Sequence, residues 1–455
     1  MNFDNFIIIK SASIMSALNQ IDLNHKGLIF VKEYSDKIIG IATDGDIRRY
    51  LLAGGNVQDH IEKCTNINFV KADQKAPREF LLKQLDQNIR MIPILDENDK
   101  LVSILSKDHF PSSEEQKVFA RAKSPVRISF GGGGSDTSNY FINNNGAVIN
   151  ATISLFSHAS LKKRDDESIH INSLDLKDKV TFNNFQDILS YQGKFSLIQS
   201  LIKAIHPDFG FELYLHSDFP MNSGLGGSSV VLSAILGCFN QFRNDKWDQH
   251  DIAEIAYQAE RLFLGVAGGW QDQYATVFGG LNFMEFKQDQ NIIHPIRLPN
   301  DVLLELEESL VLCYTGTTHD SGDIHKDQRL KSRSEEVEKR IQSNVELTFD
   351  MRNHLLRGRL NKFGKSLDMA WQLKRSFSDR ISNPWLDEIY AGAMENGAIG
   401  GKLLGAGGGG YFLFYAKHFY RHKLMDWMKG KNLEYVPFRF EESGLQSWTV
   451  REDNF

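Results

Sequence analysis

The 455-residue sequence has few cysteines, no long apolar run and little excess of charge of either sign. Its three cysteines, Cys64, Cys238 and Cys313, are odd in number and far apart, which argues against a disulfide framework and indicates reduced, unreactive thiols. No stretch approaches the length of a membrane-spanning helix, and residues 1–10 lack the basic leader and apolar length of a signal peptide. These absences predict a cytoplasmic protein without a membrane partner.

The charge balance argues against nucleic acid as a partner. Lys and Arg number 52 against 58 Asp and Glu, and no basic block is interleaved with aromatic residues. Binding to a phosphate backbone needs a concentrated positive surface, which is absent here. The chain is also too long for one ordinary domain, and its 41% hydrophobic content can support more than one core.

An internal repeat organises the first quarter of the sequence. Residues 28–43 align with residues 91–106, so that Asp36-Lys37 falls on Asp99-Lys100. Each copy combines a helical stretch with two short apolar strands around a polar turn, and the helical stretches are Ser13–Asn19 and Pro77–Asp86. Neither copy is expected to fold alone.

This arrangement resembles a tandem pair of CBS domains, modules that commonly bind adenine nucleotides. The most specific match is Gly40-Ile-Ala-Thr43-Asp-Gly-Asp46, and the resemblance implies that Thr43 and Asp46 contact the phosphate and ribose of such a nucleotide. In the second copy Asp108 falls one position early, so no second ligand site is predicted. A module that serves only dimerisation or docking is an equally open alternative. Because such pairs usually associate with another copy, a homodimer is a state to test for.

The most informative segment is Asp218–Phe239, in which a polar, glycine-rich loop runs directly into an apolar helix. Glycines lack a Cβ atom, so the loop backbone can turn tightly and approach a bulky anion. The first helical turn adds unpaired N–H groups and the positive end of the helix dipole, and two serines add hydroxyls. The loop therefore predicts ATP binding by Gly224, Leu225, Gly226, Gly227, Ser228 and Ser229.

Two further glycine runs lie near the two ends of the second part of the chain. In the first, a strand ends in four glycines and delivers Asp136; in the second, glycines at 405 and 407–410 precede an apolar strand. Flexible linkers are seldom flanked by strongly apolar segments, so both runs predict structured loops. Their predicted substrate-binding residues are Gly133, Gly134, Asp136, Gly407 and Gly408.

Together and in this order, the three runs resemble those of the GHMP kinase superfamily, over roughly Lys123–Arg451. Within it, residues 127–136 and Gly269–Ala275 are most similar to bacterial kinases that phosphorylate D-glycero-D-manno-heptose 7-phosphate at the anomeric position. The resemblance implies an α+β fold of two lobes with the site in the cleft between them, ATP and Mg²⁺ as cofactors, and a sugar phosphate as substrate. The expected divisions are a CBS-like unit at 1–112, a linker at 113–120, and lobes at 121–320 and 321–455.

Phosphoryl transfer needs an alcohol held in line, neutralised charge on the phosphate oxygens, and a bridging metal. Asp272 follows two glycines that let the chain turn back toward the loop, and it is the expected catalytic carboxylate for the acceptor hydroxyl. A loop-capping aspartate is the structural alternative. The resemblance implies that Arg127 offsets charge near the transferred phosphate, with a surface-strand salt bridge as its alternative, and that Asp136 binds the sugar hydroxyls.

The resemblance assigns the metal to Ser228 and Glu260. Gly227 replaces the first serine of the usual Gly-Leu-Gly-Ser-Ser pattern, which leaves Ser229 as an alternative to Ser228. Taken alone, Glu260 would be interpreted as a solvated helix carboxylate, because glutamate is almost always exposed.

Several questions stay open at the level of sequence. A sugar phosphate needs one more cationic contact, which either Lys374-Arg375 or the loop Thr315–Ser321 could supply, while Lys402 is interpreted as solvated. Two other functions remain as alternatives: a GHMP kinase for galactose, a hexosamine or another unphosphorylated hexose, and a non-catalytic protein that senses nucleotides.

Overall fold

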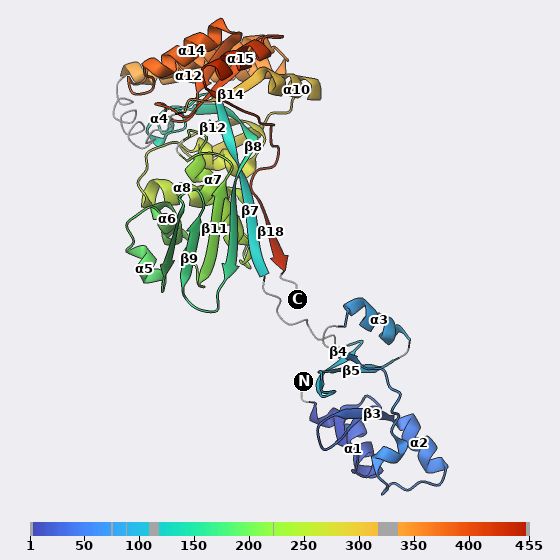
Figure 1. Cartoon of the computed structure of the whole chain (residues 1–455). Coiled ribbons are helices and arrows are strands. Elements are labelled where there is room, and N and C mark those ends of the chain that lie inside the picture. Colours follow the sequence, from blue (N-terminus) through green and yellow to red (C-terminus); the bar gives the residue numbers. More distant parts are fainter. Residues whose placement is uncertain are drawn as a thin grey trace. The chain divides into compact units, whose positions relative to one another are not determined.

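The computed structural model describes residues 3–73, 76–87, 89–108, 118–221, 223–316 and 335–451. It divides the chain into two units, Met1–Gln116 and Lys117–Phe455 (Figure 1). The predicted connector, Pro111–Lys117, lies outside the described residues. Among the helices of the described ranges, none combines the length and apolar character needed to cross a bilayer.

Each half of the first unit is a three-stranded sheet with the same topology. Strand β1 (Ile7–Ile9) lies parallel to β2 (Leu28–Lys32), which pairs antiparallel with β3 (Ile38–Thr43). The second half repeats this order with β4 (Ala72–Asp73), β5 (Met91–Leu95) and β6 (Leu101–Ser106). The helical elements are η1 (Asp4–Phe6), α1 (Ile14–Asn24), α2 (Asp44–Leu52), η2 (Ile61–Cys64) and α3 (Arg78–Asp86).

The two polar turns that the sequence repeat equates meet each other. Asp36 and Asp99 both have positive φ, at 64° and 59°. Lys37 and Lys100 form an isolated antiparallel bridge, and the Lys37 ammonium lies 2.9 Å from an Asp99 carboxylate oxygen. One apolar cluster draws side chains from both copies. Because part of the core is shared, separating the copies would expose it to water.

An eight-stranded sheet forms the first lobe of the second unit. Its longest strand, β8 (Gly146–Lys163), pairs with β7 (Val118–Gly131) on one edge and with β11 (Phe211–Ser217) and β12 (Leu281–Phe286) on the other. The sheet is completed by β9 (Ile169–Ser173), β10 (Asp178–Phe182), β13 (Asn291–Pro295) and β18 (Gln446–Arg451). Late in β8, buried and partly exposed residues alternate, so one face packs inward and the other faces solvent.

Helices cover the inner face of this sheet. Helix α7 (Gly227–Gln241) packs on β7 and β8, and α6, α7 and α8 lie together beside the strands in Figure 1. The helical elements of this lobe are α4 (Ser138–Phe141), α5 (Phe185–Leu189), α6 (Ser196–Ile205), α8 (Gln249–Tyr257), the π-helical segment η3 (Gln258–Phe263) and α9 (Gln271–Phe278).

The second lobe is built on a four-stranded antiparallel sheet in the order β15-β16-β14-β17. Its strands are β14 (Leu310–Tyr314), β15 (Ala398–Leu403), β16 (Tyr411–Ala416) and β17 (Glu434–Val436). Its helices are α10 (Asn300–Ser309), α12 (Glu335–Leu356), α13 (Leu360–Arg375), α14 (Pro384–Glu395) and α15 (Arg421–Gly430). Helix α13 packs on β15, and α12 contacts β7 and β8.

The lobes differ from the predicted division at residues 320 and 321. Strand β14 belongs to the second sheet although it precedes that position, and β18 returns from the end of the chain to pair with β7 in the first sheet. The physical reason is the edge of β7, whose N–H and C=O groups would otherwise lack partners.

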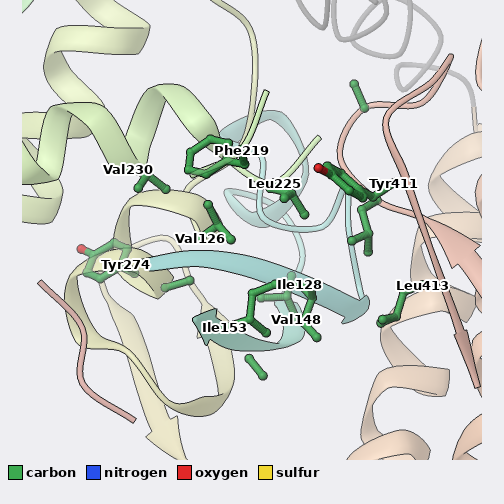
Figure 2. Close-up of a cluster of buried hydrophobic side chains, with 14 of the residues drawn as sticks. Val126, Ile128, Val148, Ile153, Phe219, Leu225, Val230, Tyr274, Tyr411 and Leu413 are labelled. Carbon is green, nitrogen blue, oxygen red and sulfur yellow. The ribbon is translucent and has the colours of Figure 1, made fainter. Parts of the chain in front are cut away.

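The core beneath the glycine-rich loop joins side chains of both lobes. Figure 2 shows Val126 of β7 near Leu225 of the loop, with Tyr411 of β16 on the other side. The side chain of Leu225 is completely buried, which stabilises the fold by about 2 kcal/mol. The side chain of Leu225 therefore anchors the loop in the core, and its backbone alone is left to face a ligand.

Candidate active site

The glycine-rich loop forms an open cradle at the start of α7. Gly224 and Gly226 have φ values of 83° and 81°, a conformation that favours glycine. A Cβ atom on Gly224 would stand 2.8 Å from the carbonyl oxygen of Leu404, so here backbone packs directly on backbone of the third glycine run. No described side chain caps the first turn of α7. Its N–H groups are therefore free to bind an anion.

A cavity of about 250 Å³ opens over this cradle. The loop forms one part of its wall, and mostly apolar side chains with a few polar groups form another; these include Ser173, Asp175, Phe195, Ile198, Leu215 and Phe219. An apolar wall with sparse polar groups suits a nucleobase, and uncapped helix amides suit phosphates. The residues present thus fit ATP.

Arg127 and Asp272 are held together at the mouth of the cradle. The Arg127 guanidinium donates from Nε and Nη2 to the two carboxylate oxygens of Asp272, both at 2.8 Å, and from Nη1 to the Gly224 carbonyl at 2.8 Å. A Cβ on Gly226 would lie 3.3 Å from Asp272 Oδ2, so the carboxylate adjoins the loop. Arg127 is only 5% exposed and Asp272 22%. The alternative of a surface salt bridge is therefore wrong for Arg127.

Glu260 lies in η3 and is 2% exposed. Both Ser228 and Ser229 donate their hydroxyls to its carboxylate, the second at 3.0 Å, and the Gln273 amide donates at 2.7 Å. Arg261 Nη1 lies 3.4 Å from Glu260 Oε1. The interpretation of Glu260 as solvated is wrong, because the π-helical segment turns this carboxylate toward the start of α7.

These oxygen groups fit a magnesium ion. Serine hydroxyls and a carboxylate are hard ligands of the kind that Mg²⁺ prefers. Within the described ranges, no group of three or more His, Cys, Asp or Glu side chains is arranged to hold a metal. Mg²⁺ at Ser228, Ser229 and Glu260 would therefore keep waters or take oxygens from a nucleotide. Because both serines reach the same carboxylate, the geometry does not choose between them.

Asp136 ties the turn after β7 to the start of α9. Its carboxylate accepts hydrogen bonds from the backbone N–H groups of Gly134 at 3.1 Å and Gln271 at 3.2 Å. Burial, and then the nearby charge of Asp272, raise the pKa of Asp136. Each carboxylate oxygen has lone pairs left over, so Asp136 can still accept hydrogen bonds from a substrate hydroxyl.

A second cavity, of about 320 Å³, adjoins the first. Gly134, Thr137 and Ser138 line it from the turn that carries Asp136, and Phe377 lines it from the second lobe. Arg261, Val266 and Ala267 line both cavities. The wall also includes Tyr257, whose ring stacks on Trp270 at 3.6 Å. Hydroxyls beside an aromatic surface form a wall that suits a sugar.

The third glycine run serves two different contacts. Gly405 packs against Gly224, whereas Gly407 lies against Ile381 and the Gly408 N–H donates to the Ile381 carbonyl at 2.9 Å. The predicted substrate contacts of Gly407 and Gly408 therefore stay predictions, and the amide of Gly408 already has an internal partner. At Gly133, by contrast, an added Cβ would meet no atom within 4 Å.

The basic residues suggested for a substrate phosphate already have internal partners. Lys374 donates to the carbonyls of Leu403 at 2.8 Å and Gly405 at 2.5 Å, and Arg375 pairs with Asp387 at 2.9 Å. In the loop 315–321, residues 317–321 lie outside the described residues. The interpretation of Lys402 as solvated is wrong: it is 4% exposed, because β15 is packed under α13.

Three residues of this site were missed at the level of sequence. Gln273 donates to Glu260, Gln271 accepts from Ser129 at 3.0 Å, and Arg261 borders both cavities. For the two glutamines, the segment Gly269-Trp-Gln-Asp272-Gln could have pointed to them, because residues on either side of Asp272 in a helix face different neighbours of the same site.

In the first unit, Thr43 and Asp46 form a capping box at the start of α2. Thr43 Oγ1 donates to Asp46 at 2.6 Å, and the Asp46 N–H donates back to Thr43 at 3.2 Å. Asp46 also pairs with Arg49. Helix capping by itself accounts for these bonds, so a nucleotide contact here stays a prediction.

Comparisons with known proteins concern the second unit. The sequence matches the family model of the GHMP kinases N terminal domain over residues 195–280 and that of the GHMP kinases C terminal region over 351–421. It is 34% identical over 336 residues to the D-glycero-alpha-D-manno-heptose 7-phosphate kinase of Campylobacter jejuni, a match that covers 72% of this chain and 99% of that relative.

Solved structures agree with this match. A D-glycero-D-manno-heptose 1-phosphate kinase from Bacteroides thetaiotaomicron superposes with a TM-score of 0.62 at 28% identity, over 73% of this chain and 100% of the other. The galactokinase of Lactococcus lactis complexed with galactose superposes with a TM-score of 0.59 at 18% identity, over 74% and 96%, which shows a shared fold.

Proposed function

The chain belongs to the GHMP kinase family and is an ATP-dependent sugar kinase that uses Mg²⁺, and from this premise we propose that its acceptor is D-glycero-D-manno-heptose 7-phosphate. The product would be the 1,7-bisphosphate, formed at the anomeric hydroxyl, for nucleotide-activated heptose and surface polysaccharide synthesis. The observation that carries the proposal is the 34% identity along 99% of a heptose 7-phosphate kinase.

In this proposal Asp272 accepts the proton of the anomeric hydroxyl as that oxygen attacks. ATP with Mg²⁺ supplies the phosphoryl group when bound. Arg127 holds both oxygens of Asp272 toward the cradle, and this ion pair also places a guanidinium beside the phosphate loop. The charge that develops on the transferred group meets Arg127 and the amides at the start of α7, which are already in place before the reaction.

Each of the two cavities takes one ligand, and because the cavities adjoin, the terminal phosphate of ATP and the acceptor hydroxyl of the sugar can meet between them. The cavity over the cradle takes the nucleotide, and the second cavity, which Thr137 and Ser138 line, takes the sugar. Asp136 comes from the same turn as these two hydroxyls, and its role in binding the sugar follows from the family resemblance. Arg261 lies where the cavities meet, tied to the carbonyls of Val266 and Ala267 at 3.2 Å. It thus positions the loop that precedes Asp272.

A panel of sugars tests the acceptor. With ATP and Mg²⁺, heptose 7-phosphate is expected to give a kcat/KM at least about 100-fold above galactose, fucose or a hexosamine, because a site built for a phosphate is left with unpaired polar groups by other sugars. ADP release measures the rate, and ³¹P NMR identifies an anomeric phosphate in the product. Faster turnover of an unphosphorylated hexose would support the second candidate acceptor, and the absence of ATP turnover with every sugar of the panel would favour the non-catalytic, nucleotide-sensing alternative.

For the first unit we propose a tandem CBS pair that regulates the kinase by binding an adenine nucleotide. The support is the match of Gly40–Asp46 to the CBS pattern, in which the residues equivalent to Thr43 and Asp46 contact the phosphate and ribose; in this structure both lie at the N-terminus of α2. A module that serves only dimerisation remains the alternative.

Calorimetry on the whole chain tests this regulation. AMP is expected to bind to the wild type and to shift the KM for ATP or the kcat. If it changes the affinity for ATP, ATP must change the affinity for AMP by the same factor. The double variant Thr43→Val, Asp46→Asn is expected to lose the AMP heat while keeping basal turnover. If the wild type gives no heat with AMP, ADP or ATP beyond that of the kinase site, the unit is reduced to a dimerisation element.

A further inference from the structure

Lys402 is a buried lysine that the mechanism above does not use. It lies on β15 in the second lobe and is 4% exposed. The described residues offer its ammonium no hydrogen bond and no ion pair. Lys374, its neighbour on α13, differs in this respect, because it donates to two carbonyls.

The charged groups that face Lys402 belong to the active site. They are Arg127 from β7, Asp136 from the turn after β7, and Lys374 from α13. Burial, and then Arg127, lower the pKa of Lys402 to about 7, while Asp136 acts in the opposite direction. Arg127 is itself bound to Asp272, and Asp136 is met by two amides. Lys402 is thus left without a dedicated counter-charge.

Lys402 lies close in the chain to residues that pack on the glycine-rich loop. Leu404 and Gly405 follow it closely and pack on Gly224, the residue whose carbonyl accepts from Arg127. Lys402 therefore approaches the region of Gly224, Arg127 and Asp136 from the second lobe, whereas the cradle belongs to the first. Lys402 is only 4% exposed, and no described group pairs with its ammonium. A positive charge in so enclosed a position favours an anion, which here a ligand would supply.

We propose that Lys402 is a further catalytic residue whose ammonium contacts the phosphoryl group while it is transferred to the sugar. This inference rests on phosphoryl transfer by the family and not on which sugar is the acceptor. Asp272 takes the proton of the acceptor hydroxyl, and Lys402 keeps its own. The phosphoryl group leaves the bridging oxygen of the nucleotide and joins the acceptor oxygen, so ADP is the leaving group and the atoms balance.

The role requires a charged Lys402, which sets a pH dependence. Because the pKa in the free protein is about 7, kcat/KM is expected to be highest below pH 7 on account of this group and to fall as pH rises above it. A bound anion favours the ammonium and raises its pKa, so the decline in kcat is expected at higher pH than the decline in kcat/KM. The facing charges that shift this pKa are Arg127, which lowers it, and Asp136, which raises it. Lys374 also faces Lys402, and its own pKa is lowered in part by the Lys402 charge.

Two substitutions and one control test the proposal. Lys402→Met is expected to lower kcat about 100-fold while KM for each substrate and the calorimetric affinity for a non-hydrolysable ATP analogue change less than about threefold. It should also weaken binding of ADP with aluminium fluoride and acceptor, which mimics the transferring group, about 100-fold. Lys402→Arg is expected to keep part of the activity and to lose the decline above pH 7. Lys365→Met, at an exposed lysine of α13, is the matched control.

Thermal melting provides a readout that does not depend on turnover. The folded pKa of about 7 lies below the ordinary value of 10.5, so charged Lys402 destabilises the free protein fully below pH 7 and progressively less toward pH 10.5. Lys402→Met is therefore expected to melt above the wild type at pH 6.5, with a smaller gain at pH 9. A lower melting temperature at both pH values would overturn the assignment of an unpaired ammonium.

Other results would overturn the proposal in specific ways. A raised KM for the sugar phosphate at unchanged kcat would assign Lys402 to the acceptor's own phosphate. Weaker binding of the ATP analogue at unchanged kcat would assign it to nucleotide binding, and an unchanged kcat with unchanged binding would make it structural. Failure of the wild type on heptose 7-phosphate would contradict the proposed acceptor alone, because the same comparison can be made with whichever sugar of the panel is phosphorylated.

Discussion

Asp272→Asn is expected to lower kcat about 10³-fold, within the range that a positioned general base contributes, while ATP binding stays nearly intact. The amide keeps the shape of the side chain but cannot take the proton of the acceptor hydroxyl. It also faces Arg127 with an N–H₂ group in place of one acceptor oxygen. Because Arg127 is 5% exposed and Asp272 22%, the variant is further expected to lose about 3 kcal/mol of stability, the lower end of the range for breaking a buried ion pair.

Steady-state kinetics with calorimetric binding of an ATP analogue separate these effects, and melting curves show whether the variant is folded at the assay temperature. Asp289→Asn, at an exposed aspartate between β12 and β13, controls for the loss of a charge. Full retained turnover in a folded Asp272→Asn protein would remove Asp272 from the mechanism. A variant that loses analogue affinity as strongly as turnover would show that the carboxylate mainly shapes the phosphate loop.

Glu260→Gln is expected to lower kcat/KM about 100-fold and to raise the Mg²⁺ concentration needed for half-maximal activity at least about tenfold. Glutamine keeps one acceptor oxygen, so it can accept either from Ser228 or from Ser229 and Gln273, and its NH₂ group faces the other donor. It also lacks the negative charge that attracts a hard cation. Because the carboxylate is buried beside Arg261, the variant leaves that guanidinium with its three carbonyl partners only.

Titration of Mg²⁺ at saturating nucleotide measures this effect. The matched control is Glu254→Gln, six residues earlier, where an exposed glutamate accepts only from Tyr274 at 3.2 Å. Magnesium dependence that is identical in the two variants would contradict a metal site at Glu260. Loss of activity that excess Mg²⁺ does not restore, with normal Mg²⁺ affinity, would give Glu260 a role in holding the start of α7.

Much of the fold follows from local pattern. The repeat in residues 28–43 and 91–106 predicted two copies of one strand–turn–strand unit, because alternating apolar residues around an Asp-Lys turn favour that conformation wherever they occur. The loop before α7 was equally predictable from the sequence, because closely spaced glycines directly before an apolar helix favour a tight turn into that helix. The return of β18 to the first sheet could not be predicted, because its pairing with β7 joins segments more than three hundred residues apart in the sequence.

The sequence predicted site residues well where a motif named them, and poorly where their burial had to be judged from residue type alone. Asp272 and Arg127 were assigned by motif, and the structure brings them within 2.8 Å of each other. Lys402 was interpreted as solvated, and Glu260 would have been without the resemblance that assigned it to the metal, because Glu and Lys usually are exposed; both are buried in the structure. Residue type predicts only the average exposure of a side chain, whereas its exposure in one protein depends on which helix or strand packs against it.

The amino-acid sequence by itself determined the glycine-rich loop, the carboxylate that follows Gly268 and Gly269, and the repeat, because each depends on residues close together in the chain and on backbone conformations that those residues favour. Only the tertiary structure decided which distant side chains meet: that Ser228 and Ser229 share Glu260, that Lys374 and Arg375 are already engaged, and that the ammonium of Lys402 has no partner among the described residues. The physical reason is that charge and burial are set by contacts between distant segments, and a linear pattern does not record which distant segments will touch.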